Sequence, residues 1–121
     1  MDFKTLEKIR KKEASSKTAL SSLPNDFYKD CQEALDYAFK TNDYQGFTDI
    51  QRLVQNIHQI RQGKLLNFAI YRSIRNRDLE SPDNILPHEE KLLNQFLASL
   101  NENNDDFDVL LNGYYFQEVR T

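Results

Sequence analysis

The chain has 121 residues, with 16 Lys and Arg against 19 Asp and Glu, two His and one Cys. This length suits one domain that buries about two-thirds of its unfolded surface. No uncharged run approaches the about 20 residues of a membrane helix, and the start at Met1-Asp2-Phe3-Lys4 lacks the apolar core of a signal peptide. We therefore expect a cytoplasmic protein with no membrane partner. The lone Cys31 excludes an internal disulfide and a cysteine-based zinc site.

Charge is unevenly distributed along the chain. Residues 1–77 hold 14 of the Lys and Arg but 9 of the Asp and Glu, whereas residues 78–121 hold 2 and 10. We expect the two parts to attract each other or to bind separate partners. A solvated helix surface explains the basic residues more simply than a nucleic-acid site does, although weak contact with DNA stays open.

The spacing of apolar residues predicts a first helix over about residues 2–15, with Phe3, Leu6 and Ile9 on one face. Projected forward, the same face includes Glu13. A carboxylate at that position either reaches solvent at the helix end or meets a cation inside the packed layer. The Ser-rich segment that follows, up to Leu23, is typical of a connector.

A second helix is expected to begin near Pro24, because proline lacks only an N–H that the first turn of a helix leaves unpaired. Asn25 and Asp26 would place polar acceptors at its N-terminus. Cys31 falls on its apolar face, where a small apolar filler is a simpler interpretation than a reactive thiol. The expected buried face comprises Phe27, Cys31, Ala34, Leu35 and Ala38.

A long third helix is predicted from about Tyr44 to about Arg75, and Asn42 with Gln45 resembles a capping box at its start. At about 1.5 Å per residue such a helix spans nearly 50 Å, more than the width of a compact domain of this size. Arg61 and Lys64 lie within its apolar stripe. We therefore predict that Glu13 pairs with Arg61 or Lys64 inside the bundle.

Beyond Gly63 this helix carries apolar residues in nearly every direction around its axis, which indicates cover on more than one side. Three other modest helices can cover one side of this long helix but not both sides over its length, so the pattern predicts a partner subunit. Two alternatives stay open: the first or fourth helix covers the second side, or Gly63 breaks the helix. The predicted subunit interface comprises Leu65, Leu66, Phe68, Ala69, Ile70, Tyr71 and Ile74.

After a polar loop over 76–86, a fourth helix is expected from Pro87, with Leu92, Leu93, Phe96, Leu97 and Leu100 facing the core. Residues 101–106 are predicted to form an acidic linker, 107–112 a short helical turn and 114–119 a strand. Such a strand pairs with another chain, or the sequence stops where a β-domain would begin. The predicted fold is all-α: a bundle of four or five helices over 1–100 with one long central helix, followed by a linker and strand over 101–121.

The sequence lacks a Gly-rich phosphate loop, a His-Glu-x-x-His motif and a Gly-x-Ser-x-Gly motif, which argues against common enzyme classes, and it indicates no cofactor or metal. Neighbours in sequence point to different helix faces, so solvated surface explains the pairs Glu89-Glu90 and Asp105-Asp106 more simply than an acid/base couple does. His88 lies beside two Glu and could bind a metal only with ligands from elsewhere, so a surface histidine is the simpler interpretation. Arg52 and His58 resemble the Arg-x4–6-His element of HEPN ribonucleases. Leu53 replaces the polar residue usual there, and six positions place the pair about 120° apart on a helix.

Three segments together resemble subunits of the archaeal GINS complex, the scaffold of the replicative helicase. Leu23-Pro24-Asn25-Asp26-Phe27-Tyr28 is similar to the family's Leu-Pro-x-Asp-Phe-Tyr at the start of its second helix. Ile60-Arg61 with Lys64-Leu65 and Ala69 is similar to its Arg-x-x-Lys-Ile block on the third helix. The third segment, Leu86-Pro87-His88-Glu89-Glu90, is similar to its Leu-Thr-Pro-Glu-Glu start of the fourth helix.

The resemblance implies a helical A-type domain that assembles as a tetramer, from identical chains or from two kinds of subunit, and acts in DNA replication. It implies no catalytic group, and it implies MCM helicase and a RecJ-like protein as partners. In such subunits a small β-domain follows, opening with a Val-Arg strand like Val119-Arg120. A HEPN-like ribonuclease and a different helical adaptor that dimerises through the third helix remain the alternatives.

Overall fold

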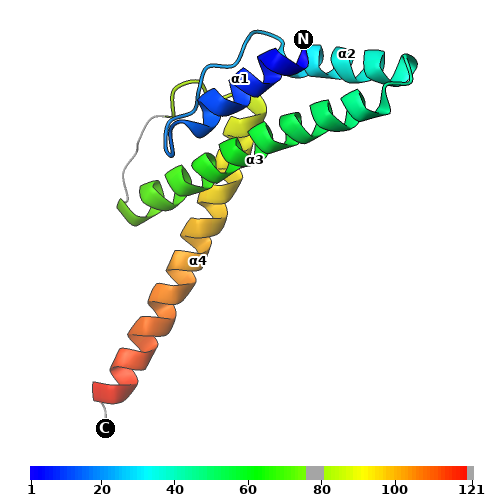
Figure 1. The fold of residues 1–121 in the computed structure, drawn as a ribbon. Coiled ribbons are helices and arrows are strands. Elements are labelled where there is room, and N and C mark those ends of the chain that lie inside the picture. The colour runs from blue at the N-terminus through cyan, green and yellow to red at the C-terminus, as the bar shows by residue number, and fades with distance from the viewer. Residues whose placement is uncertain (76–80, 120–121) are drawn as a thin grey trace. The chain divides into compact units, whose positions relative to one another are not determined.

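The computed structural model describes residues 1–75 and 81–119, and these residues form four α-helices and no strand (Figure 1). The helices are α1 (Phe3–Ala14), α2 (Phe27–Lys40), α3 (Tyr44–Arg75) and α4 (Pro87–Val119). The all-α class predicted from the sequence is therefore confirmed. Residues 76–80 of the expected loop and Arg120 of the expected strand lie outside the described residues.

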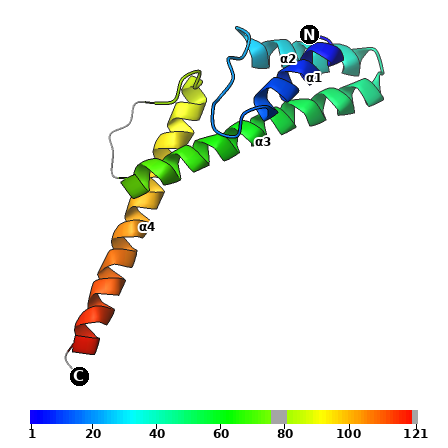
Figure 2. The same ribbon diagram turned by 60° about the vertical axis from the view of Figure 1, so that its left-hand side comes forward.

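The chain divides into two compact units. Met1–Lys64 with Pro82–Ile85 form one, which we call the N-terminal unit, and Leu65–Ser81 with Leu86–Thr121 form the other, the C-terminal unit. Within the N-terminal unit, α2 and the first part of α3 run antiparallel, and α1 lies alongside them (Figures 1 and 2). The core of this unit consists of Leu6, Phe27, Cys31, Ile50 and Ile57.

The start of α2 differs from the prediction. The helix begins at Phe27, and Pro24 lies in a turn before it, in which the Phe27 N–H donates to the Pro24 carbonyl at 3.2 Å. Asp26 has a left-handed backbone with φ of 57°, and its side chain makes no capping hydrogen bond. Leu23 packs against the core before the turn and Phe27 is buried after it, so the turn directs both side chains into the core.

The start of α3 is confirmed at Tyr44, but its cap is not the predicted Asn42. Asp43 caps the helix, because its Oδ1 accepts a hydrogen bond from the Gly46 N–H at 3.0 Å. Asn42 instead has a left-handed backbone with φ of 58°, which the turn between α2 and α3 requires. The predicted capping box between Asn42 and Gln45 is therefore wrong, and the residue that caps the helix lies one position later.

Helix α3 is continuous over all 32 residues from Tyr44 to Arg75, so the alternative in which Gly63 breaks it is wrong. A glycine inside a helix costs up to about 1 kcal/mol relative to alanine, which is too little to interrupt a long helix whose other residues favour it. The side of Gly63 where a Cβ would project is open.

Helix α4 continues for 33 residues, from the predicted start at Pro87 to Val119. The predicted linker over 101–106, the separate turn over 107–112 and the strand over 114–119 are therefore wrong, and no boundary falls at residue 100. Asn and Asp lower helix propensity by less than about 1 kcal/mol each, so a polar run without proline does not end a helix. A lone strand would leave its backbone groups unpaired, whereas a helix pairs them internally.

Replacing Gly63 with alanine is expected to raise the free energy of unfolding by up to about 1 kcal/mol, because the methyl group meets no atom and the helix gains propensity. Urea unfolding followed by circular dichroism measures the change. Gly46→Ala is the matched control: its Cβ would run into the Asp43 carboxylate that caps α3, so no gain is expected. A Gly63→Ala protein less stable than the parent would contradict an open surface at this position.

Candidate functional site

The most distinctive polar feature is a buried ion cluster in the N-terminal unit. Glu13 at the end of α1 meets both cations from α3: its Oε1 lies 2.7 Å from Nη1 of Arg61, and its Oε2 lies 2.6 Å from Nζ of Lys64. Glu13 and Arg61 are fully buried and Lys64 is 5% exposed. The sequence predicted a pair with one of the two cations, and the structure brings all three side chains together.

The same side chains hold the connector between α1 and α2. Ser21 donates to Glu13 twice, from its backbone N–H at 3.1 Å and from its hydroxyl at 2.8 Å. Arg61 donates to the Ser21 carbonyl at 2.8 Å, and Lys64 donates to the Ala19 carbonyl at 2.7 Å. An irregular segment thereby finds partners for backbone groups that no helix satisfies.

The loop at Pro82–Ile85 joins this network through Asn84. Arg61 donates from Nη2 to the Asn84 carbonyl at 2.9 Å, and the Asn84 side-chain amide donates to the Leu20 carbonyl at 3.1 Å. The backbone of Asn84 is left-handed, with φ of 65°. The cluster therefore links α1, α3, the connector and a loop distant in sequence.

Glu13 is ionised in this environment. Burial raises the pKa of its carboxyl, but the hydrogen bonds from Lys64, Arg61 and Ser21 outweigh burial and hold the pKa below the ordinary value of 4.5. Because the three charged side chains are shielded from water, they do not offer a surface to a substrate. The cluster is suited to fixing structure rather than to chemistry.

The residues of the predicted subunit interface on the last part of α3 fall into three groups, which are buried, half-buried and exposed. Leu65 and Ala69 are fully buried by the chain itself, so the expectation that they contact a partner is wrong. Phe68 is half-buried. The remaining residues stay exposed, from 37% for Ile70 to 72% for Ile74, and this group comprises Leu66, Ile70, Tyr71 and Ile74.

A second exposed apolar group lies on α4 in the same C-terminal unit, and sequence analysis missed it. Phe107, Val109, Leu110 and Leu111 are each more than half exposed. The missed indication was the continuation of the helical spacing of Leu97 and Leu100 through the polar run to Phe107 and Leu111. Asn104, at the centre of that run, donates to the Ser73 hydroxyl of α3 at 3.3 Å. We refer to these exposed apolar residues of α3 and α4 together as the apolar surface.

Glu89 is also buried, at 1% exposure, although the sequence analysis assigned it to the solvated surface. Its Oε1 accepts a hydrogen bond from the Leu86 N–H at 3.0 Å, which is the return bond of a capping box at the start of α4. The spacing of Glu89, Leu93 and Leu97 would have placed the glutamate on the buried face. Glu90, by contrast, is exposed and accepts from the Ser81 hydroxyl at 3.2 Å.

Other candidate groups occupy less reactive positions. Arg52 is exposed and His58 half-buried on the unbroken α3, about 120° apart around its axis. Burial, with a contribution from Asp30, raises the pKa of Cys31 to about 11, which matches the expected role of a core filler. Within residues 1–75 and 81–119 no group of His, Cys, Asp and Glu is arranged to hold a metal ion, and no helix is long and apolar enough to cross a bilayer.

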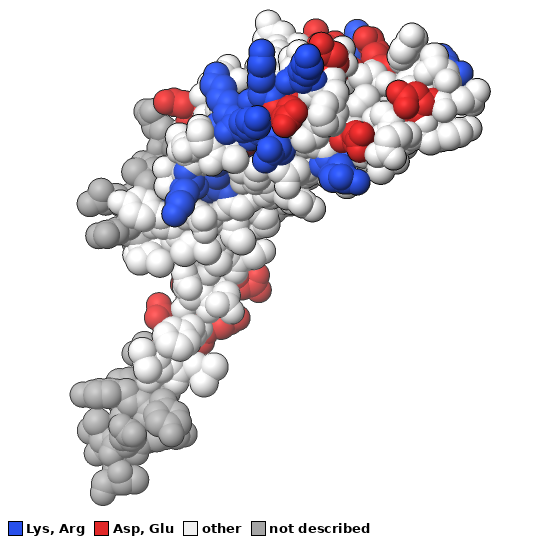
Figure 3. Space-filling model, viewed as in Figure 1, with Lys and Arg blue, Asp and Glu red and all other residues white. Residues whose placement is uncertain are grey.

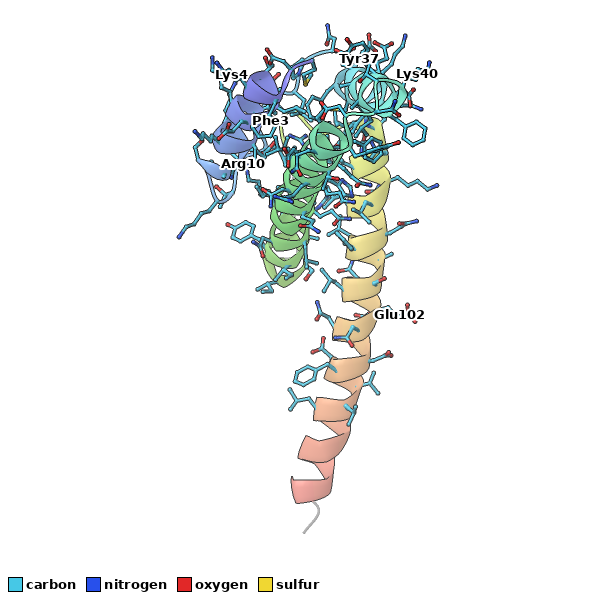
Figure 4. The ribbon with its side chains drawn as sticks, turned by 45° about the vertical axis from the view of Figure 1, so that its right-hand side comes forward. Phe3, Lys4, Arg10, Tyr37, Lys40 and Glu102 are labelled. Carbon is cyan, nitrogen blue, oxygen red and sulfur yellow. The ribbon has the colours of Figure 1, made fainter. Side chains whose placement is uncertain are left out.

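The basic residues gather over α1, as Figure 3 shows. Lys4, Lys8, Lys11 and Lys12 are all exposed, and Lys11 lies 3.7 Å from Glu7 on the same helix. Lys4 lies on the outer side of α1 in Figure 4. This surface provides several exposed cations to a polyanion.

Removing the buried carboxylate is expected to be far more damaging than removing an exposed one. Glu13→Gln leaves Arg61 and Lys64 without their anion, so the free energy of unfolding should fall by about 3–5 kcal/mol. Glu7→Gln breaks an exposed pair on the same helix and should change it by less than about 1 kcal/mol. Urea unfolding of both variants makes the comparison, and a Glu13→Gln protein as stable as the parent would remove the assigned role.

Acid should act on the same carboxylate. Since the folded pKa of Glu13 is depressed, the stability it contributes is fully present above about pH 4.5 and is lost as the pH falls through the folded pKa. Thermal unfolding between pH 7 and pH 3 should therefore show a steeper loss for the parent than for Glu13→Gln. Parallel pH profiles for the two proteins would contradict a depressed pKa.

The comparisons with known proteins give no relative from which a role could be transferred. No protein-family model matches the chain. No curated protein matches it, and no solved structure does. The function must therefore be inferred from the residues and contacts of this chain.

Proposed function

We propose that the chain is a non-catalytic scaffold subunit that assembles with further subunits of GINS type and links MCM helicase to a RecJ-like protein in DNA replication. The observation that carries the scaffold role is the apolar surface of the C-terminal unit. Large apolar side chains scattered singly are normal on a protein surface, but grouped ones are typical of interaction sites. On α4 the group comprises Phe107, Val109, Leu110 and Leu111, all within five positions.

The length of the exposed helix supports assembly. Of the α4 residues from Asn101 to Leu111, Asn104 is half-buried and every other residue is exposed. This segment extends the continuous α4 beyond the part whose side chains the chain buries, and most helical stability in proteins comes from packing of an apolar face. Packing against another subunit would bury the apolar side chains and stabilise the helix together. The acidic residues of this segment, Glu102, Asp105, Asp106 and Asp108, would then lie at the rim of the contact.

The GINS assignment is supported by the positions of the family-like residues in the N-terminal unit. Leu23 and Phe27 enter the core on either side of the turn that precedes α2. Tyr28 packs beside Phe27, with ring centroids 5.1 Å apart. Arg61 and Lys64 form the buried cluster with Glu13. Both of these segments that carry the resemblance thus have a defined structural role, as motifs that specify a fold require. The basic surface of α1 offers several cations for weak contact with DNA.

Self-association is the first measurable consequence. At tens of micromolar we expect light scattering to give a mass several times the 14.3 kDa of one chain, because the apolar surface is then covered. Leu110→Asp should weaken association by about tenfold or more, since it places a charge in an apolar contact. Asn103→Asp adds the same charge at an exposed polar position of α4 and should leave association unchanged. A parent chain that stays monomeric would contradict assembly from identical subunits.

The replication partners need a separate experiment. We expect the purified chain, together with any second subunit type it requires, to retain MCM helicase and a RecJ-like protein from the same organism in a pull-down. Leu110→Asp should lose the complex if assembly is a precondition for it, whereas Asn103→Asp should keep it. Stable association without retention of either partner would support a different helical adaptor and contradict the replication role.

A further inference from the structure

We propose that a groove in the N-terminal unit binds a short basic peptide segment of another protein, a segment with an apolar side chain between Lys or Arg residues. The groove has a volume of about 490 Å³ and lies between the start of α1, the middle of α2 and the start of α3. This volume falls in the range of about 300–1,000 Å³ that is typical of ligand sites. It is separate from the apolar surface on which the proposed assembly rests.

The floor and lip of the groove are apolar. Ala38 and Ile50 form buried parts of its wall, and Ala34 lines it beside them. Phe3 from α1 and Tyr37 from α2 are exposed by 45% and 72%, so two aromatic rings stand at its edge. Figure 4 labels both. An apolar side chain of a ligand would find contacts on the floor, and a guanidinium would find an aromatic face at the edge.

Four carboxylates surround this apolar floor, from Asp2, Glu33, Asp43 and Asp49, and no Lys or Arg is among the described residues that line it. Asp2 Oδ1 accepts a hydrogen bond from the Thr5 N–H at 2.8 Å, and Asp43 Oδ1 accepts one from the Gly46 N–H at 3.0 Å. Asp49 accepts from the Gln45 amide on Oδ1 at 3.0 Å. The Oδ1 hydrogen bond of each of these three aspartates fixes the orientation of its carboxylate beside the groove.

The arrangement of these carboxylates favours a peptide over a metal ion. Among the described residues, no three acidic groups converge closely enough to coordinate one ion. They are distributed around the floor instead, so each can pair with a separate cationic group of an extended ligand. Their complementary charge would also steer a basic segment toward the groove, whereas the lysines of α1 would repel it from the outer surface of that helix.

The probe for this site is a fluorescein-labelled peptide with the sequence Lys-Arg-Leu-Phe-Lys-Arg, followed by fluorescence anisotropy on the full chain. The double variant Glu33→Gln with Asp49→Asn removes two charges without touching a helix cap, and it should weaken binding by about tenfold at low salt. Asp83→Asn with Glu102→Gln removes the same charge away from the groove and should leave binding unchanged. Circular dichroism verifies that all variants are folded.

The apolar contribution is tested independently. Tyr37→Ala should weaken binding by about fivefold at every salt concentration, because it removes an exposed ring and no side-chain hydrogen bond. A peptide with Ser in place of Leu and Phe should bind the parent protein about fivefold less tightly than the original peptide does. A peptide with Glu in place of Lys and Arg should not bind.

Three results would overturn the proposal. They are equal binding by the parent and the groove double variant, equal binding of the Ser-substituted peptide, and a Tyr37→Ala protein that loses self-association because a second copy fills the groove. Since the proposed assembly uses Phe107 and Leu110 of the C-terminal unit, failure of peptide binding would leave the scaffold role intact.

Discussion

The fold of the N-terminal unit depends on the pairing of three buried charged side chains, Glu13, Arg61 and Lys64. Glu13 can remain ionised only because Arg61, Lys64 and Ser21 donate to it. These bonds are directional, so they define how far α1 extends along α3 and where the connector crosses. Apolar contacts alone would tolerate sliding of one helix along another, whereas a buried ion cluster tolerates almost none. Its effect is on the choice of arrangement more than on net stability, which desolvation reduces.

The two units differ in which side chains they leave exposed. In the N-terminal unit the core, the ion cluster and the helix caps account for the buried groups named above, and the exposed side chains include the lysines of α1, the carboxylates of the groove and the rings of Tyr37, Phe39 and Tyr44. The C-terminal unit exposes large apolar side chains from both of its helical segments, and among the described large apolar side chains of this unit Ile74 and Val109 are the most exposed, at 72% and 73%. In the proposed scaffold role, the first unit would fix the fold and the exposed apolar side chains of the second would contact other chains.

Helical segments followed from the sequence wherever the apolar period was long and uninterrupted. Helix α3 begins at Tyr44 and ends at Arg75 as expected, since the helix-forming residues on both sides of Gly63 outweigh its small penalty. The sequence also indicated the position of Glu13 on an apolar face, because a helical wheel requires only the spacing of residues along one helix. Where the local indications were weak, prediction failed: α4 continues through 101–106, because polar residues without proline lower helix propensity only slightly.

The sequence by itself determined that most of the chain is helical and that Glu13, Arg61 and Lys64 lie on the apolar faces of their helices. Only the tertiary structure decided that one carboxylate meets both cations, that Glu89 is buried, and which side of α3 the chain covers. Leu65 is hidden while its neighbour Leu66 is exposed, although both have the same apolar character. Periodicity reports which residues share a face of one helix, but burial depends on elements distant in sequence that pack against that face.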